Sequence, residues 1–96
     1  MSEMITRHLS IRGLVQGVGF RRYMMYKAQQ LDISGWVRNR SDGSVEATVH
    51  GTQDAVASII ECARRGPRAS QVSAVTVSDV ENAENFGGRF DPRSTK

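Results

Sequence analysis

Cysteine, proline and aromatic residues are all scarce in this sequence. Its 96 residues include one cysteine, two prolines and 6% aromatic residues. The single cysteine, Cys62, excludes an intramolecular disulfide and any zinc site built on several cysteines. No stretch approaches the roughly 18 consecutive apolar residues of a membrane helix, and the N-terminus lacks the apolar run of a signal peptide. We therefore expect a cytoplasmic protein that does not insert into a membrane.

Long blocks of like charge are missing as well. The chain has 13 Lys and Arg residues against 10 Asp and Glu residues, which gives a formal net charge of +3. A mild positive charge favours anions in general and selects no single class of partner. The length suits one domain with a modest core. We expect residues 1–96 to form one monomeric domain with flexible ends at residues 1–6 and 92–96.

The apolar spacing of the first half predicts a strand, a helix and a hairpin. Residues 7–13 alternate between apolar and polar side chains, as in a half-buried strand. A helix follows, which we expect to end near Asp32, whose short side chain tolerates a left-handed backbone. Strands at residues 35–39 and 45–49 then flank a turn that we place at residues 42–44. The apolar stripe of the helix comprises Phe20, Met24, Ala28 and Leu31.

The second half predicts another helix and a long strand. Thr52 is a suitable N-cap for the helix, and the Gly-Pro pair at residues 66–67 ends it. Residues 72–80 are expected to form a strand, with a bulge where Val72 and Ala74 fall out of phase with Val75. Phe86 and Phe90 bracket a possible short fifth strand, which the intervening glycines weaken. The apolar stripe of this helix comprises Val56, Ile59, Ile60 and Ala63.

This order predicts an α+β fold, a ferredoxin-like βαββαβ sandwich with two helices on one face of an antiparallel sheet. A right-handed crossover makes the first two strands parallel, with the third strand between them. Their C-terminal ends then lie at the same edge of the sheet. Arg21 and Asn39 should therefore meet there, unless Asn39 only begins the hairpin turn.

Residues 15–21 (VQGVGFR) form a glycine-containing loop that enters the first helix. Glycine lets the backbone approach a ligand closely, and a helix N-terminus presents unpaired N–H groups to an anion. Arg21 and Arg22 occupy the first turn, where the helix dipole disfavours cations unless an anion binds. The alternative is a surface turn followed by two solvated arginines.

These motifs resemble the acylphosphatase family over nearly the whole chain. Residues 11–21 (IRGLVQGVGFR) match the first signature of that family without a gap, and residues 35–39 (GWVRN) match the second. The resemblance extends to Gly43, Val45, Gly51 and the Gly66-Pro67 segment. The chain departs from the family at Asp32, where a glycine is common, and at residues 86–90, where the family ends in a more apolar strand.

The resemblance implies a hydrolase that cleaves the carboxyl–phosphate bond of acyl phosphates to a carboxylate and inorganic phosphate. It also implies that Arg21 binds the phosphoryl group and that Asn39 positions the attacking water. The phosphate-binding set would be Gln16, Gly17, Val18, Gly19, Phe20 and Arg21, mainly through their backbone amides. We expect no cofactor and no metal, since neither His8 nor His50 has further ligands at a useful spacing.

Two other functions stay open at this stage. A non-catalytic accessory domain that binds phosphate or carbamoyl phosphate would keep the same loop without turnover. A small basic ferredoxin-like domain could also bind RNA, but such domains stack bases on aromatic residues of the open sheet face. The open-face positions expected on the central strands carry none, and Trp36 alone, on an outer strand, does not make a stacking platform, so we expect no nucleic-acid partner. The physiological acyl phosphate is not specified by these motifs.

Overall fold

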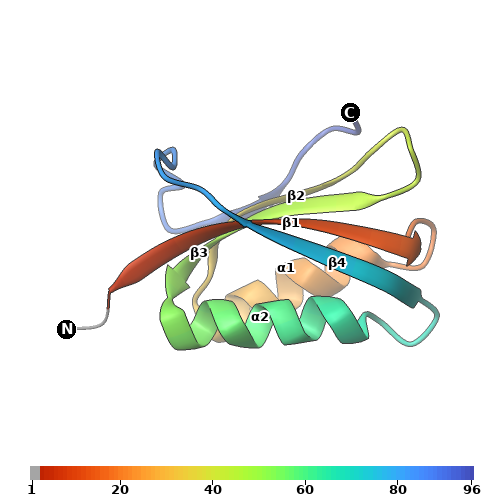
Figure 1. Cartoon of the computed structure of the whole chain (residues 1–96), viewed down its shortest axis with the longest axis horizontal. Coiled ribbons are helices and arrows are strands. Elements are labelled where there is room, and N and C mark those ends of the chain that lie inside the picture. The colour runs from red at the N-terminus through yellow and green to blue at the C-terminus, as the bar shows by residue number, and fades with distance from the viewer. Residues whose placement is uncertain (1–2) are drawn as a thin grey trace.

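The computed structural model describes residues 3–96 and contains a five-stranded sheet covered on one face by two helices (Figure 1). The strand order is β4-β1-β3-β2-β5, with β3 between β1 and β2. The predicted βαββαβ sandwich is therefore confirmed, with a fifth strand added at the edge. The elements are β1 (Met4–Leu14), α1 (Phe20–Leu31), β2 (Ser34–Asn39), β3 (Val45–Thr52), α2 (Gln53–Arg65), β4 (Gln71–Asp79) and β5 (Phe90–Pro92).

The core lies between the sheet and the helices, because the inward residues of β1 and β3 alternate in phase. Leu9 pairs with Ala47 and Ile11 pairs with Val45, and all four are buried. The helices add the buried stripes that their spacing predicted. These stripes consist of Phe20, Met24 and Ala28 on α1, and of Val56, Ile59 and Ala63 on α2.

The helix ends follow local rules. Asp32 ends α1 in a left-handed conformation (φ 57°), as predicted. The Thr52 hydroxyl caps α2 by accepting a hydrogen bond from the Ala55 N–H at 3.2 Å. Each cap satisfies a backbone group that the helix leaves without an internal partner.

The strand irregularities are close to those expected. The register of β1 with β4 shifts opposite Ser73, because Arg12 pairs with Ala74 and Gly13 pairs with Val72. The predicted bulge is thus confirmed. The β2–β3 turn is displaced by one residue from the predicted 42–44, since the Arg40 N–H still donates to the Ser44 carbonyl at 2.8 Å.

Both chain ends are more ordered than expected. The prediction for residues 1–6 is wrong for residues 4–6, which pair with β3; residues 1–2 lie outside the described part. The last strand is β5 rather than residues 86–90, because Gly87 and Gly88 adopt positive φ angles (63° and 72°) that interrupt an extended chain. β5 runs parallel to β2, which makes the sheet mixed.

The C-terminal tail continues along β2 instead of fraying. The Arg93 N–H donates to the Val37 carbonyl at 2.9 Å, and the Lys96 N–H donates to the Asn39 carbonyl at 3.1 Å. These bonds occupy acceptors that an edge strand would otherwise expose. The tail at residues 92–96, for which we expected a flexible end, thus lies along β2 with two backbone hydrogen bonds.

Candidate active site

The loop between β1 and α1 has the backbone geometry of an anion site. Gly17 and Gly19 have φ angles of 74° and 80°, whereas the residues between and beside them have no positive φ. Alternation of left-handed and right-handed residues turns successive N–H groups toward one side, which is the geometry of an anion-binding nest. A Cβ added at either glycine would meet no protein atom within 4 Å. Backbone conformation, and not packing, therefore requires glycine at these two positions.

The first turn of α1 supplies further donors to the same side. Gly19 is the N-cap and provides no side-chain cap, and the first turn carries no acidic residue. The Tyr23 N–H donates to the carbonyl of the N-cap residue, Gly19, at 3.0 Å. The N–H groups of Phe20, Arg21 and Arg22 therefore have no acceptor within the helix. Together with the exposed guanidinium of Arg21, they form a positive helix terminus.

The side chain of Gln16 joins this loop to the β2–β3 turn. Its Nε2 donates to the Arg40 carbonyl at 2.7 Å and to the Ser44 carbonyl at 2.8 Å. Arg40 directly follows β2, and Ser44 directly precedes β3. These two hydrogen bonds thus hold the loop beside the end of β2.

Asn39 reaches the loop because of strand phase. It pairs with Val45, and Val37 pairs with Ala47, so all four share the helix-side face of the sheet. Asn39 is the last residue of β2 and lines a cavity of about 460 Å³ together with residues of the loop and of α1. The full lining is Val15, Gly17, Gly19, Phe20, Arg21, Arg22, Met25, Asn39 and Pro92.

The cavity brings together most of the residues that the sequence singled out. Arg21, Asn39, Gly17, Gly19 and Phe20 all line it. Gln16 and Val18 do not. The Gln16 side chain turns to the β2–β3 turn, and Val18 packs against the core.

Four further residues of the cavity wall were not predicted as site residues. Val15 begins the loop and Arg22 directly follows it, so both could have been included from their position. Met25 lies outside the predicted apolar stripe of α1 and carries no other sequence signal. Pro92 had no usable sequence signal, because the parallel pairing of β5 with β2 brings it to the cavity.

On the opposite face of the sheet from Asn39, the buried carboxylate of Glu46 in β3 bonds to side chains of neighbouring residues. Glu46 is 4% exposed, and its carboxylate accepts hydrogen bonds from His8 Nε2 at 3.0 Å, from Arg40 at 3.2 Å and from Arg38 Nε. Burial by itself would raise the pKa of Glu46, but the hydrogen bonds from His8, Arg38 and Arg40 outweigh it and hold that pKa below its usual value. Arg38 and Arg40 flank Asn39, so this cluster fixes the strand end that carries it.

Among residues 3–96, no three His, Cys, Asp or Glu side chains come together as potential metal ligands. Neither helix in this part of the chain is long and apolar enough to cross a membrane.

The comparisons with known proteins agree with one another. The family model described as Acylphosphatase matches residues 7–92. An acylphosphatase of Thiobacillus denitrificans is 51% identical over 91 residues, which cover 95% of this chain and 99% of that protein. The crystal structure of acylphosphatase from Bacillus subtilis superposes with a TM-score of 0.88 at 32% identity, covering 95% of this chain and 99% of that one. Full-length HypF, in a phosphate- and nucleotide-bound form, gives a TM-score of 0.87 at 29% identity, and the match covers 99% of this chain but 12% of HypF.

Proposed function

Because this chain belongs to the acylphosphatase family and is a hydrolase of acyl phosphates, we propose that it cleaves the carboxyl–phosphate bond by direct attack of water. The products are a carboxylate and inorganic phosphate. The observation that carries the proposed mechanism is the cavity in which Arg21, Asn39 and the two glycines of the loop meet.

In this proposal Arg21 and the backbone N–H groups of residues 16–21 hold the phosphoryl group. A guanidinium presents a planar fork of donors that matches two phosphate oxygens, and the free N–H groups of the loop and of the helix terminus bind the remaining charge. The transferring phosphoryl group is metaphosphate-like, with its charge on the non-bridging oxygens. Positioned donors therefore stabilise the transition state directly.

The leaving group explains why no general acid is required. A carboxylate leaves as the conjugate base of an acid with a pKa of about 4, so it departs without a proton from the enzyme. Catalysis then consists of positioning and charge stabilisation, which the arginine and the amides supply. The proposal accordingly involves no metal ion.

Asn39 is assigned to the attacking water. A neutral amide is too weak a base to remove a proton, but its oxygen accepts from water while its nitrogen donates to a phosphoryl oxygen. In a loose transition state the water requires direction more than deprotonation. We therefore expect no covalent phosphoenzyme.

We further infer that the enzyme is a cytoplasmic monomer that acts on small molecules and not on nucleic acid. Base stacking requires an accessible aromatic face. Trp36 is the aromatic residue of the β2 open face, and it is 8% exposed, with the guanidinium groups of Arg38 and Arg93 over its ring at 4.7 and 4.8 Å.

The test is hydrolysis of acetyl phosphate in the presence of excess chelator by the wild-type protein and by Asn39→Ala. We expect chelator-resistant hydrolysis by the wild type and a sharp fall of kcat in the variant. Inorganic phosphate should bind both proteins with similar affinity, because Arg21 and the loop, which supply most of the donors to phosphate, are intact. Normal turnover by Asn39→Ala would contradict the role of the amide, and isolation of a phosphorylated protein would contradict direct attack by water.

The same experiment addresses the alternative of a phosphate-binding accessory domain. The match to a small part of HypF is the observation that favours it. Binding of phosphate without hydrolysis of acetyl phosphate by the wild-type protein would establish that alternative and overturn catalysis.

A further inference from the structure

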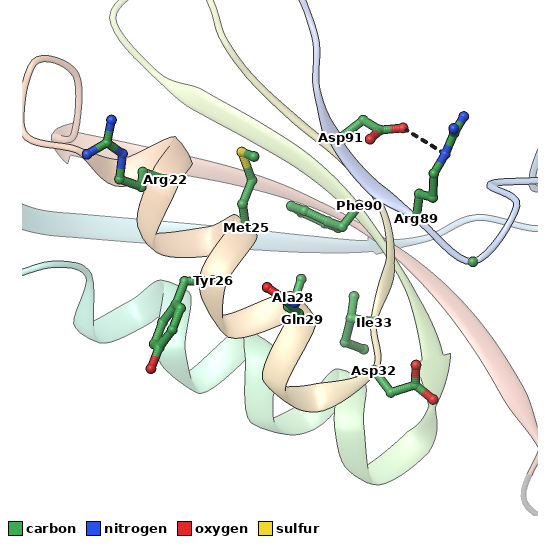
Figure 2. Close-up of a pocket in the computed structure, with 11 residues that line it drawn as sticks. Arg22, Met25, Tyr26, Ala28, Gln29, Asp32, Ile33, Arg89, Phe90 and Asp91 are labelled. Carbon is green, nitrogen blue, oxygen red and sulfur yellow. Dashed lines mark ion pairs between the residues drawn. The ribbon is translucent and has the colours of Figure 1, made fainter.

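A second cavity, of about 520 Å³, lies along α1. It adjoins the cavity of about 460 Å³ that contains Arg21 and Asn39, which we call the catalytic cavity. Arg22 and Met25 line both cavities, so they stand at the junction. One wall of the second cavity is a stripe of α1 that runs through Arg22, Met25, Gln29 and Asp32. The opposite wall is the segment 88–91, which leads into and includes part of β5 (Figure 2). We name this space, between α1 and β5, the α1–β5 groove.

Topology sets the direction of the α1–β5 groove. The helix α1 starts at the phosphate loop and leads away from it. β5 is parallel to β2, which ends at Asn39, so Pro92 lies nearest the catalytic cavity and Gly88 lies at the far end. The ten residue steps from Arg22 to Asp32, the C-cap of α1, span about 15 Å at the rise of an α-helix. The groove therefore adjoins the proposed phosphate site at Arg22 and Met25 and leads away from it, with room for a substantial substituent.

The middle of the α1–β5 groove is apolar. Met25 projects from α1, and the ring of Phe90 reaches from β5 toward it (Figure 2). Both side chains are partly exposed while packing against the core, and Ala28 and Ile33 lie behind them. A thioether and a ring edge form an adaptable, polarisable surface that suits another aromatic ring. Polar groups lie farther out, where Arg89 pairs with Asp91 at 3.6 Å.

We propose that the α1–β5 groove is the binding site for the acyl group of the substrate, and that Met25 and Phe90 select acyl phosphates with an aromatic acyl group. This inference rests on the proposed function. The carbonyl carbon of an acyl phosphate lies one bridging oxygen from phosphorus, so its substituent must leave the phosphate site through an adjoining space. The groove adjoins the catalytic cavity at Met25. A benzoyl ring placed there would pack against apolar side chains and lose its contact with water.

The first test compares kcat/KM for benzoyl phosphate and acetyl phosphate. In the wild type we expect a preference for benzoyl phosphate. Met25→Gln, which keeps the length of the side chain, and Phe90→Ala should each lower the benzoyl-to-acetyl ratio by about tenfold, as expected for loss of an apolar contact to a substrate. Met4→Ala is the matched control, because Met4 is 52% exposed on β1 and lines neither cavity. It should leave both rates unchanged.

The second test measures binding without turnover. Phenacylphosphonate and acetonylphosphonate replace the bridging oxygen of benzoyl and acetyl phosphate by a methylene group and are not hydrolysed. In protein labelled with ¹³C at the methionine methyl groups, phenacylphosphonate should shift the Met25 signal strongly, and acetonylphosphonate should shift it weakly. The Met4 signal should not move.

The outcomes separate this inference from the proposed function. Acetyl phosphate hydrolysis by the wild type, combined with an unchanged benzoyl-to-acetyl ratio in Met25→Gln and Phe90→Ala, would overturn the acyl site and leave the activity standing. An unmoved Met25 signal at saturating phenacylphosphonate would overturn it independently, even where Phe90→Ala fails to fold. Absence of hydrolysis of both substrates would overturn the proposed function and the acyl site with it.

Discussion

The amide of Gln16 donates a hydrogen bond to the carbonyl of Arg40 at 2.7 Å, across 24 positions of sequence. A second bond from the same nitrogen reaches Ser44 at 2.8 Å. Gln16 therefore ties the β1–α1 loop to the turn that follows Asn39. Its side chain does not line the cavity, so we expect it to act by holding the loop in place relative to Asn39.

Gln16→Ala should lower kcat for acetyl phosphate on the order of tenfold, because small displacements of positioned groups have large effects on rate. Loss of the two hydrogen bonds should also lower the free energy of unfolding by about 1–2 kcal/mol. Kinetics and urea unfolding measure both effects. Gln30→Ala, an exposed glutamine on α1 outside the cavity, is the control and should change neither. A variant of Gln16 with normal kcat would show that the loop keeps its position without the tie.

Arg21→Ala should lower kcat/KM on the order of a thousandfold, as for arginines that stabilise transferring phosphoryl groups. The inhibition constant of inorganic phosphate should rise as well, because the guanidinium also binds the product. Arg21→Lys should recover little, since an ammonium group makes no bidentate contact. Arg64→Ala removes an exposed arginine of α2 that pairs with Glu61 and should leave the kinetics unchanged. Full activity of Arg21→Lys would mean that a point charge is sufficient.

Gly19→Ala should weaken phosphate binding, because φ of 80° is strained for alanine. The strain should lower the free energy of unfolding by about 1–2 kcal/mol. Gly87→Ala imposes similar strain at φ of 63°, also with no protein atom near the added Cβ. It should reduce stability without affecting phosphate binding. Equal loss of phosphate affinity in the two variants, measured by calorimetry, would show that the loop geometry has no specific role.

Glu46→Gln should lower the free energy of unfolding by about 3 kcal/mol at neutral pH, since it leaves the guanidinium groups of Arg38 and Arg40 and the ring N–H of His8 without their carboxylate. The pKa of Glu46 is held below its usual value in the folded protein by His8, Arg38 and Arg40. The unfolded chain therefore binds the proton first, at a pH near the ordinary value of about 4.3. The stabilisation is complete above that pH and is lost as the pH falls through the lower folded value.

Urea unfolding at neutral pH and at a pH below the ordinary pKa of glutamate measures this effect. The difference between the wild type and Glu46→Gln should shrink at the lower pH. Glu61→Gln, which removes a carboxylate that is 70% exposed, should show a small difference at both. A pH-independent difference for Glu46→Gln would mean that its packing, and not its charge, stabilises the strand.

Much of the fold was predictable because its causes are local. Side-chain periodicity predicted α1 and α2. In a hairpin, residues separated by an odd number of positions can pair and share a face, and this rule placed Val37 opposite Ala47 and Asn39 on the same face. A break in that periodicity located the bulge at Ser73. Each of these features depends on neighbours within a few positions, so the local sequence pattern predicts it directly.

The C-terminal segment was predicted poorly because its structure depends on distant partners. Phe90 and Pro92 form a strand through parallel pairing with β2, and the tail reaches Asn39 through bonds to backbone carbonyls. Backbone pairing of this kind leaves little trace in side-chain pattern. The glycines before β5 suggested a break in the strand but not where the chain resumed it.

The sequence by itself determined the glycine loop, the arginine at the helix start and the order of strands that places Asn39 beside them. Tertiary structure decided what surrounds that pair: the Gln16 tie, the buried Glu46 cluster and the groove between α1 and β5. The physical reason is range. Backbone preferences and periodicity act within a turn or a strand, whereas hydrogen bonds and packing between residues dozens of positions apart exist only once the sheet has set the register of its strands.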